Sequence, residues 1–353
     1  MEKLWYPGEV RTSRGLVEAN GRDIKFCTAK PVGFSDGLSP DDIRTVVFEH
    51  GVGEIGWLQR RIIVELARFG LRVVAFNSDL LAAGSGINKE TVNAHREAYL
   101  RVANETGILE TPHDLVAHSL GGFTAAAGPL ANIGQNEDNG HQHTQVDKAI
   151  LLAPASVTPE SYLSEAWKDW AWTLDLATRL ASFRAHERSW KEHRNNLAKS
   201  FFKTLLTEAK KGRKDPQVAL AGLSIVYEMR KLNRVPDAFA TLANVSVVPE
   251  IINAIKHGVG VSIVSGNQDQ LFPIGQLTEA ISSGKKRTNL GARVPVVEVW
   301  GNGHSSLGTD AGHNILNVLA FILRNQPNDG TYKLPMILGA KSLPNFDTVS
   351  IIR

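Results

Sequence analysis

Strand-like and helix-like segments alternate along most of this chain, and this alternation limits its fold more than any other feature. Residues 44–51 are a β-branched run ending in glycine, which predicts a buried strand, and apolar residues at helical spacing over 55–69 predict a helix after it. Gly70 stands where a left-handed residue typically closes a helix. A second buried strand is predicted over 71–76. This order favours βαβ units around a parallel sheet.

The pattern continues for most of the sequence. The further predicted elements are a helix (88–106), a strand (114–118), a small-residue helix (119–133), a strand (146–153), a strand (258–264), a helix (273–283), a strand (294–300) and a helix (314–324). Upstream, residues 15–30 alternate around Asn20-Gly21, a dipeptide that favours a two-residue hairpin turn. The predicted fold class is α/β, with a mostly parallel central sheet flanked by helices.

One long stretch interrupts the alternation. From about residue 154 to 256 the sequence is helix-patterned and has no strand-like run. Connections between strands and helices usually take about 2–6 residues, so a gap of this length predicts a structured insertion. We therefore divide the chain into a core (1–155 and 250–325), an inserted helical lid (156–249) and a C-terminal extension (326–353), whose role the pattern leaves open.

Composition excludes several classes of protein. The 353 residues include one cysteine, Cys27, which excludes an internal disulfide and any cysteine-rich metal site. The net charge of +3 gives no argument for nucleic-acid binding. No signal peptide or membrane-spanning run is recognisable, and no phosphate-binding glycine motif follows the first strand. We expect a cytoplasmic protein with a small-molecule substrate, no cofactor, no metal, no nucleic-acid partner and no membrane span.

The segment around Ser119 is the sharpest local feature. Ser119 lies where a predicted strand runs directly into a predicted helix. Ala117 and Gly121 are small, as a cramped strand-to-helix turn requires, and the backbone N–H of Leu120 would lie at the helix N-terminus, where it favours negative charge. The alternative interpretation is an ordinary N-cap serine.

This segment resembles the nucleophile elbow, G-x-S-x-G, of the α/β-hydrolase family, with Ala117 in place of the first glycine. The strand and helix order is similar to that family over about 15–324, apart from the insertion. The resemblance implies a Ser–acid–His triad in that chain order, with the acid and the histidine after late strands. It implies that Ser119 is the nucleophile.

The resemblance also implies the other two triad members. Asp269 follows a predicted strand in a Gly-Asn-Gln-Asp turn, and His304 lies in a glycine-rich turn after the last core strand. We expect the triad Ser119–Asp269–His304, with Asp310 as the alternative acid. A turn-forming aspartate and a surface histidine are the alternative interpretations of Asp269 and His304.

A His-Gly segment after the first core strand resembles the second half of the family's oxyanion hole. The resemblance implies that the backbone N–H groups of Val52 and Leu120 bind the oxyanion, because Gly51 lets the backbone approach the substrate. We expect His50, Gly51, Ala117, His118 and Gly121 to support the loop and the elbow. His118 should point away from Ser119.

The inserted segment concentrates positive charge. Residues 161–240 hold 15 Lys and Arg against 9 Asp and Glu, so the remainder of the chain is net acidic. A solvated helical face and electrostatic steering of an anionic substrate are both compatible with this excess.

The family resemblance implies a serine hydrolase that cleaves a carboxylic ester, lactone or amide of a small, partly hydrophobic substrate through an acyl-enzyme. Acyl transfer or C–C bond hydrolysis by the same triad stays open. So does a receptor-like protein that binds ligand with little turnover, and the oligomeric state is unknown.

Overall fold

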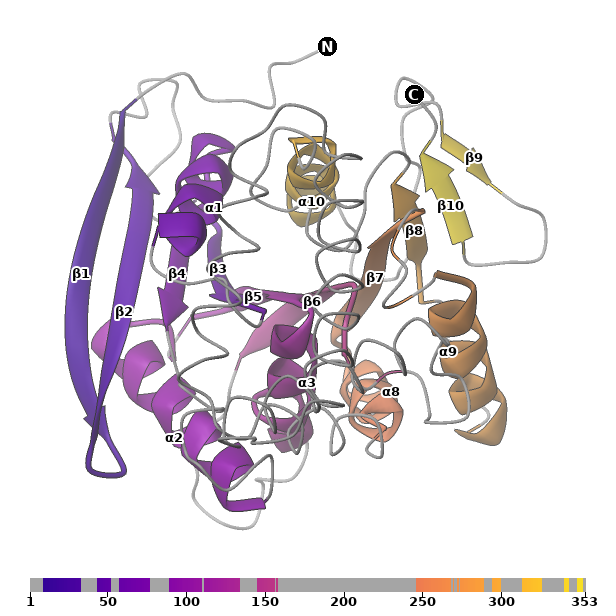
Figure 1. Cartoon of the computed structure of the whole chain (residues 1–353), viewed down its shortest axis with the longest axis horizontal. Helices are drawn as coiled ribbons and strands as arrows, with labels where there is room; N and C mark the ends of the chain where they lie inside the picture. Colours follow the sequence, from indigo (N-terminus) through magenta and orange to yellow (C-terminus); the bar gives the residue numbers. More distant parts are fainter. Residues whose placement is uncertain are drawn as a thin grey trace, which may run out of the picture.

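A computed structural model gives the fold around one large sheet (Figure 1). It describes residues 9–32, 43–51, 57–76, 89–109, 111–133, 145–155, 157, 246–267, 269, 272, 274–288, 294–299, 313–325, 340–342 and 348–351. Its strands are β1 (Val10–Ala19), β2 (Arg22–Pro31), β3 (Thr45–Glu49), β4 (Arg72–Phe76), β5 (His113–His118), β6 (Val146–Leu152), β7 (Gly260–Gly266), β8 (Val296–Val299), β9 (Ala340–Ser342) and β10 (Thr348–Ile351). Its helices are α1 (Trp57–Arg68), α2 (Lys89–Glu105), α3 (Leu120–Ala127), the 3₁₀ turn η2 (Leu130–Asn132), α8 (Val248–Lys256), α9 (Ile274–Thr288) and α10 (His313–Asn325).

The sheet order is β1-β2-β4-β3-β5-β6-β7-β8-β10-β9. Strands β4, β3, β5, β6, β7 and β8 pair in parallel, whereas β2 pairs antiparallel with β4. The prediction of an α/β fold with a mostly parallel sheet is confirmed. The predicted hairpin is also confirmed, because β1 and β2 pair antiparallel around Asn20 (φ 52°) and Gly21 (φ 69°). Positive φ at both turn residues is what a type I′ hairpin requires.

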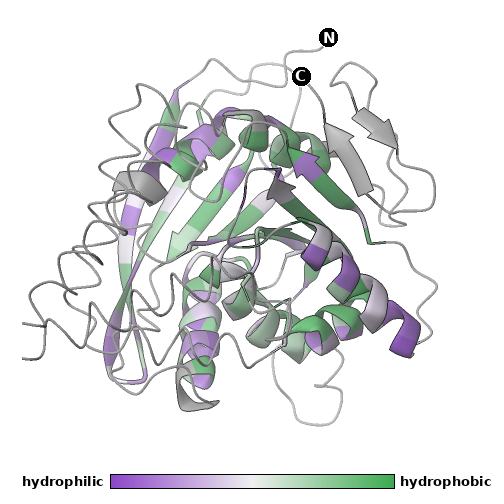
Figure 2. Ribbon diagram, turned by 45° about the vertical axis from the view of Figure 1, so that its right-hand side comes forward, coloured by the Kyte–Doolittle hydropathy of each residue, from purple (hydrophilic) through white to green (hydrophobic). Residues whose placement is uncertain are grey.

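Helices cover both faces of the sheet, so the central strands are buried on both sides. Within β3, the side chain of Val47 packs in the cluster under α2, α3, α8 and α9, whereas Val46 and Phe48 pack in the cluster under α1 and α10. Successive side chains of a strand point to opposite faces, and burial of both faces produces a continuous apolar run. Figure 2 shows the result, with hydrophobic strands in the interior and hydrophilic positions on the outer helix surfaces.

Several predicted boundaries differ from the structure; the helix predicted over 273–283, for example, extends to Thr288 as α9. The helix predicted over 119–133 is wrong beyond Ala127, which is the last residue of α3. Gly128 and Pro129 follow, and the separate 3₁₀ turn η2 comes after them. Proline disfavours helical geometry in the residue before it and lacks an N–H for the helix ladder, so the sequence contained the signal. The C-terminal extension is not featureless: β10 adds to β8 in parallel, from the Thr348–Val296 pair to the Ile351–Val299 pair.

Most of the predicted lid lies outside the described residues. In this part of the chain the structure describes residue 157 and then residues 246–256, which include α8. No helix in the described part of the chain is long and apolar enough to cross a membrane.

The strand order places two loops together at one edge of the sheet. Strand β3 lies between β4, to which the chain goes first, and β5, to which it goes next. Helices α1 and α2 make these crossovers on opposite faces. Such a change of direction leaves a crevice at the carboxyl ends of the two central strands, and it is the usual ligand site of an open α/β sheet. Here the residues that follow the carboxyl ends of β3 and β5 are His50-Gly51 and Ser119.

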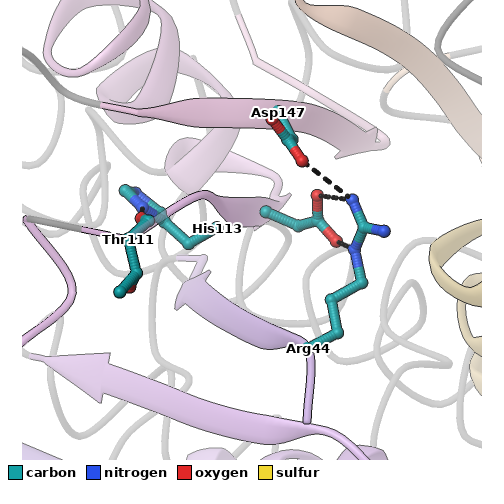
Figure 3. A network of polar contacts seen from close by, with 5 residues as sticks. Arg44, Thr111, His113 and Asp147 are labelled. Carbon is teal, nitrogen blue, oxygen red and sulfur yellow. Dashed lines mark hydrogen bonds and ion pairs between the residues drawn. The ribbon is translucent and has the colours of Figure 1, made fainter. Parts of the chain in front are cut away.

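The opposite edge of the sheet carries an ion-pair cluster (Figure 3). Arg44 precedes β3, and its guanidinium contacts Asp114 of β5 through Nε and Nη2 and lies 3.5 Å from Asp147 of β6. Burial raises the pKa of Asp114, and the bond from Arg44 opposes this rise. Burial also lowers the pKa of the neighbouring Lys148. The cluster therefore joins the starts of three central strands.

A second buried polar pair lies at the same edge. The Tyr99 hydroxyl of α2 lies 2.5 Å from His113 Nε2, and His113 Nδ1 lies 3.1 Å from the Thr111 carbonyl oxygen. Since a carbonyl only accepts, Nδ1–H donates to Thr111 and Nε2 accepts from Tyr99. Burial lowers the pKa of His113 and raises that of Tyr99, so the pair is uncharged at neutral pH.

The Arg44–Asp114 contact gives a pH-dependent prediction. In Arg44→Leu the buried Asp114 carboxylate loses its guanidinium, so its folded-state pKa rises further above the unfolded value. A raised acid pKa stabilises the fold below the unfolded pKa, and this stability is lost as pH rises toward the folded pKa. We expect the free energy of unfolding to fall by about 3 kcal/mol near about pH 8 and by clearly less near about pH 4.5, measured by urea denaturation.

The control is the double variant Arg44→Leu/Asp114→Asn, in which residue 114 cannot ionise. Asp147 and Lys148 face the same position in both variants, so only the titration of Asp114 differs. The double variant should lose the extra destabilisation at high pH. An equal loss at both pH values in the single variant would contradict the role given to Arg44.

Candidate active site

Ser119 occupies a sharp turn between β5 and α3. Its backbone has φ 54° and ψ −116°, a conformation that non-glycine residues rarely adopt. Backbone strain of this kind costs about 1–3 kcal/mol and persists only where neighbouring contacts impose it. The half-buried serine therefore sits in a conformation that the rest of the structure maintains.

Hydrogen bonds hold the turn on both sides. The Ser119 N–H donates to Leu152 O of β6 at 2.9 Å, and the Ser119 carbonyl accepts from the N–H groups of Gly122 and Ala155, both at 2.9 Å. The turn is thus tied to the end of β6 as well as to its own helix.

Three glycines allow the close approach of the backbones around Ser119. A Cβ on Gly51 would lie 2.9 Å from Ser119 Cβ, and one on Gly121 would lie 2.2 Å from the Glu49 carbonyl oxygen. A Cβ on Gly122 would lie 2.4 Å from Pro154 Cβ. Cβ atoms in real structures do not come this close to other atoms. Larger side chains at these three positions would therefore separate β3 or β6 from α3. The small residues Gly51 and Gly121 thus contribute to the elbow through close packing, as does the fully buried Ala117.

The geometry differs from that of an ordinary N-cap serine. An N-cap residue usually has β-region dihedrals, and its side-chain oxygen accepts a bond from an N–H of the first helical turn. Ser119 has a positive φ and makes no side-chain cap bond. The strand–turn–helix context matches the one in which a nucleophilic serine is presented above a sheet.

Asp269 lies three residues beyond β7, at the same edge of the sheet. It is 5% exposed, and its Oδ1 accepts a 2.9 Å bond from the Phe272 N–H. Its own N–H donates to Gly266 O at 3.0 Å. Asp269 therefore does form the turn, as the alternative interpretation holds. A carboxylate offers about four acceptor sites, so this bond is compatible with a second role.

The structure describes some of the other predicted site residues and not others. His50 Nδ1 lies 2.8 Å from the Gly51 carbonyl oxygen, so the imidazole braces the exit of β3. His118 is buried at 4% exposure, and its Nδ1 is 3.2 Å from the position of a Cβ on Gly51. Leu120 is buried at the start of α3. His304, Val52 and the alternative acid Asp310 lie outside the described residues, so their roles stay predictions.

One buried polar cluster beside the site was missed by the sequence reasoning. Glu49, the last residue of β3, is 2% exposed, and its Oε2 lies 2.9 Å from His95 Nε2 of α2. The Thr124 hydroxyl of α3 donates to the same oxygen. His95 also stacks on Phe76, with ring centroids 5.4 Å apart. A signal was present, because Glu49 is a charged residue at the end of an otherwise apolar buried strand.

No group of three or more His, Cys, Asp or Glu side chains within the described ranges could hold a metal ion.

Comparison with known proteins identifies the family. The sequence model of the alpha/beta hydrolase family matches residues 46–316, which is more than half of the chain. No curated protein gives a significant match to the sequence.

Solved structures share the fold at low sequence identity. An esterase from Exiguobacterium antarcticum has a TM-score of 0.55 and 16% identity, over 88% of this chain and 99% of that one. Naproxen esterase from Bacillus subtilis has a TM-score of 0.55 and 16% identity, over 90% of this chain and 93% of that one. A bacterial membrane phospholipase A has a TM-score of 0.53 and 18% identity, over 89% and 87%. At these identities the likeness shows the fold alone.

The close approach at Gly121 gives a matched pair of substitutions. In Gly121→Ala the new Cβ meets the backbone carbonyl of Glu49 at 2.2 Å, and a backbone atom of a central strand has little freedom to move. We expect the free energy of unfolding to fall by about 1–3 kcal/mol. Gly275→Ala, also in a first helical turn, meets nothing within 4 Å and should be neutral or stabilising by about 0.4–1 kcal/mol.

Both variants can be compared by thermal unfolding in the same buffer. Equal stability of Gly121→Ala and the wild type would mean that β3 and α3 are not in close contact at this point, and the elbow geometry described here would be wrong.

Proposed function

The chain belongs to the alpha/beta hydrolase family, and from this premise we propose that it is a serine hydrolase that cleaves a carboxylic ester of a small, partly hydrophobic substrate. The observation that carries the proposal is the strained turn at Ser119, between a buried parallel strand and a helix N-terminus. Strain at a polar residue, at the ligand-binding edge of an α/β sheet, is typical of a functional site.

The proposed reaction has two halves. In the first, Ser119 Oγ attacks the carbonyl carbon while His304 takes the hydroxyl proton, and Asp269 holds the imidazole in the correct orientation. The tetrahedral intermediate then collapses, the ester C–O bond breaks, and His304 returns the proton to the leaving alcohol. In the second half His304 deprotonates water, which attacks the acyl-enzyme and releases the acid and Ser119.

Two backbone N–H groups are proposed to stabilise the oxyanion of each tetrahedral intermediate. Leu120 N–H lies at the start of α3, where the helix dipole favours negative charge. Val52 N–H follows the His50-Gly51 segment that approaches Ser119. Loss of one such donor costs about 2.7–4 kcal/mol of transition-state stabilisation.

The substrate class is proposed from solved structures that share the fold and from the charge of the inserted segment. Of the three solved structures compared above, two are esterases and the third is a phospholipase A. We propose that residues 156–249 form a lid over the carboxyl edge of the sheet and that the pocket lies between lid and core, as is common for small-molecule sites. The positive charge of this segment favours a substrate that carries an anionic group.

A fluorophosphonate probe tests the nucleophile directly, because it forms a stable adduct with an activated serine. The wild-type protein is expected to be labelled in stoichiometric amount, with the adduct mapped by mass spectrometry to the peptide that contains Ser119. Ser119→Ala should not be labelled. Ser13→Ala is the matched control, since Ser13 is an exposed serine on β1 that hydrogen-bonds to Thr28, and it should be labelled like the wild type.

Equal labelling of the wild type and Ser119→Ala would refute the proposed nucleophile. Labelling at Ser119 without repeated release of alcohol from a panel of chromogenic esters would favour the receptor-like alternative over the hydrolase.

A further inference from the structure

Glu49 joins three elements around the proposed site. Its Oε2 lies 2.9 Å from His95 Nε2 of α2 and accepts a hydrogen bond from the Thr124 hydroxyl of α3. With Glu49 as a carboxylate, both neighbours donate to this one oxygen. No described residue bonds to the other oxygen, Oε1, although it is buried. The side chain therefore ties β3 to the two helices through a single atom.

The backbone of the same residue touches the elbow. Glu49 is paired in register with Ala117, two residues before Ser119. Its carbonyl oxygen lies against Gly121, where a Cβ would approach to 2.2 Å. Glu49 thus contacts the β5–α3 turn through its main chain and the middle of α3 through its side chain.

The positions of the proposed oxyanion donors explain why this contact matters. Leu120 begins α3, four residues before Thr124, and Val52 follows Glu49 by three residues. One donor is thus carried by the helix that Thr124 belongs to, and the other by the segment that Glu49 begins. A donor stabilises the transition state only when its N–H is correctly placed for the developing charge.

We propose that Glu49 is a positioning residue, whose bond to Thr124 fixes the β3 exit against α3 and so sets the spacing of the Val52 and Leu120 N–H groups. The inference rests on the proposed function, because it assigns Glu49 a role in that reaction. Packing alone does not require a carboxylate here, since an apolar side chain at a buried strand end avoids the desolvation cost of a charge.

Thr124 offers the sharpest test, because its hydroxyl can be removed without a change of shape. Thr124→Val keeps the branched side chain and loses the bond to Glu49, whereas Thr124→Ser keeps the hydroxyl. We expect Thr124→Val to lower kcat for a chromogenic ester by about tenfold with KM nearly unchanged, because misplaced donors weaken the transition state more than the bound substrate. Thr124→Ser should recover most of this loss.

Tyr99→Phe separates positioning from stability. It removes another buried hydroxyl, which hydrogen-bonds to His113 at the opposite edge of the sheet. We expect Thr124→Val and Tyr99→Phe to lower the melting temperature alike, and Tyr99→Phe to leave kcat at the wild-type value. Affinity for a boronic acid, which forms a tetrahedral adduct at an active serine, should fall in Thr124→Val in proportion to kcat.

The outcomes are distinguishable from failure of the proposed function. A wild-type protein that fluorophosphonate does not label at Ser119 contradicts the hydrolase itself. A wild type that is labelled and active, with kcat equal in Thr124→Val and Thr124→Ser, leaves the hydrolase standing and overturns the role of Glu49. A matching loss of kcat in Tyr99→Phe also overturns it, because the effect would then follow stability.

Discussion

Both backbone polar groups of Ser119 are hydrogen-bonded: its N–H donates to Leu152 O, and its carbonyl accepts from the N–H groups of Gly122 and Ala155. These bonds hold the residue at φ 54°, where a side chain is strained. The segment after β3 also packs closely against the turn, since a Cβ on Gly51 would lie 2.9 Å from Ser119 Cβ. The parallel sheet, the small residues around it and the helix behind it are all needed for this one turn to form.

Buried polar residues of the core lie at both ends of the parallel strands. The ion-pair cluster of Arg44 and the Tyr99–His113 pair join the amino ends of the strands, where buried polar groups have well-defined partners. The carboxyl ends carry Ser119, Asp269 and the His50-Gly51 segment. The Glu49 cluster also lies at the carboxyl end, where it is a buried polar group in contact with α3 and close to the elbow.

The sequence predicted the core of the fold well, because strands buried on both faces are continuous apolar runs and their helices keep a regular period. The prediction of one helix over 119–133 failed because Gly128 and Pro129 end α3. No strand was predicted for β10, because its pairing depends on β8, which is distant in the sequence. Ser119 was identifiable since strand, turn and helix are contiguous there. Glu49 itself carries a signal, as a charged residue at the end of a buried strand. Its partners His95 and Thr124 were not predictable, because they lie 46 and 75 residues away in the sequence. His304, Val52 and the lid remain predictions.

The strain at Ser119 is the central claim, and the unfolding free energy of Ser119→Gly measures it. Glycine adopts φ 54° freely, so the substitution should relieve strain while it removes the nucleophile. We expect a variant that is more stable than the wild type by about 1 kcal/mol and is not labelled by fluorophosphonate. For an ordinary N-cap serine, glycine would instead lower stability by a few tenths of a kcal/mol. A less stable Ser119→Gly variant would therefore contradict the elbow.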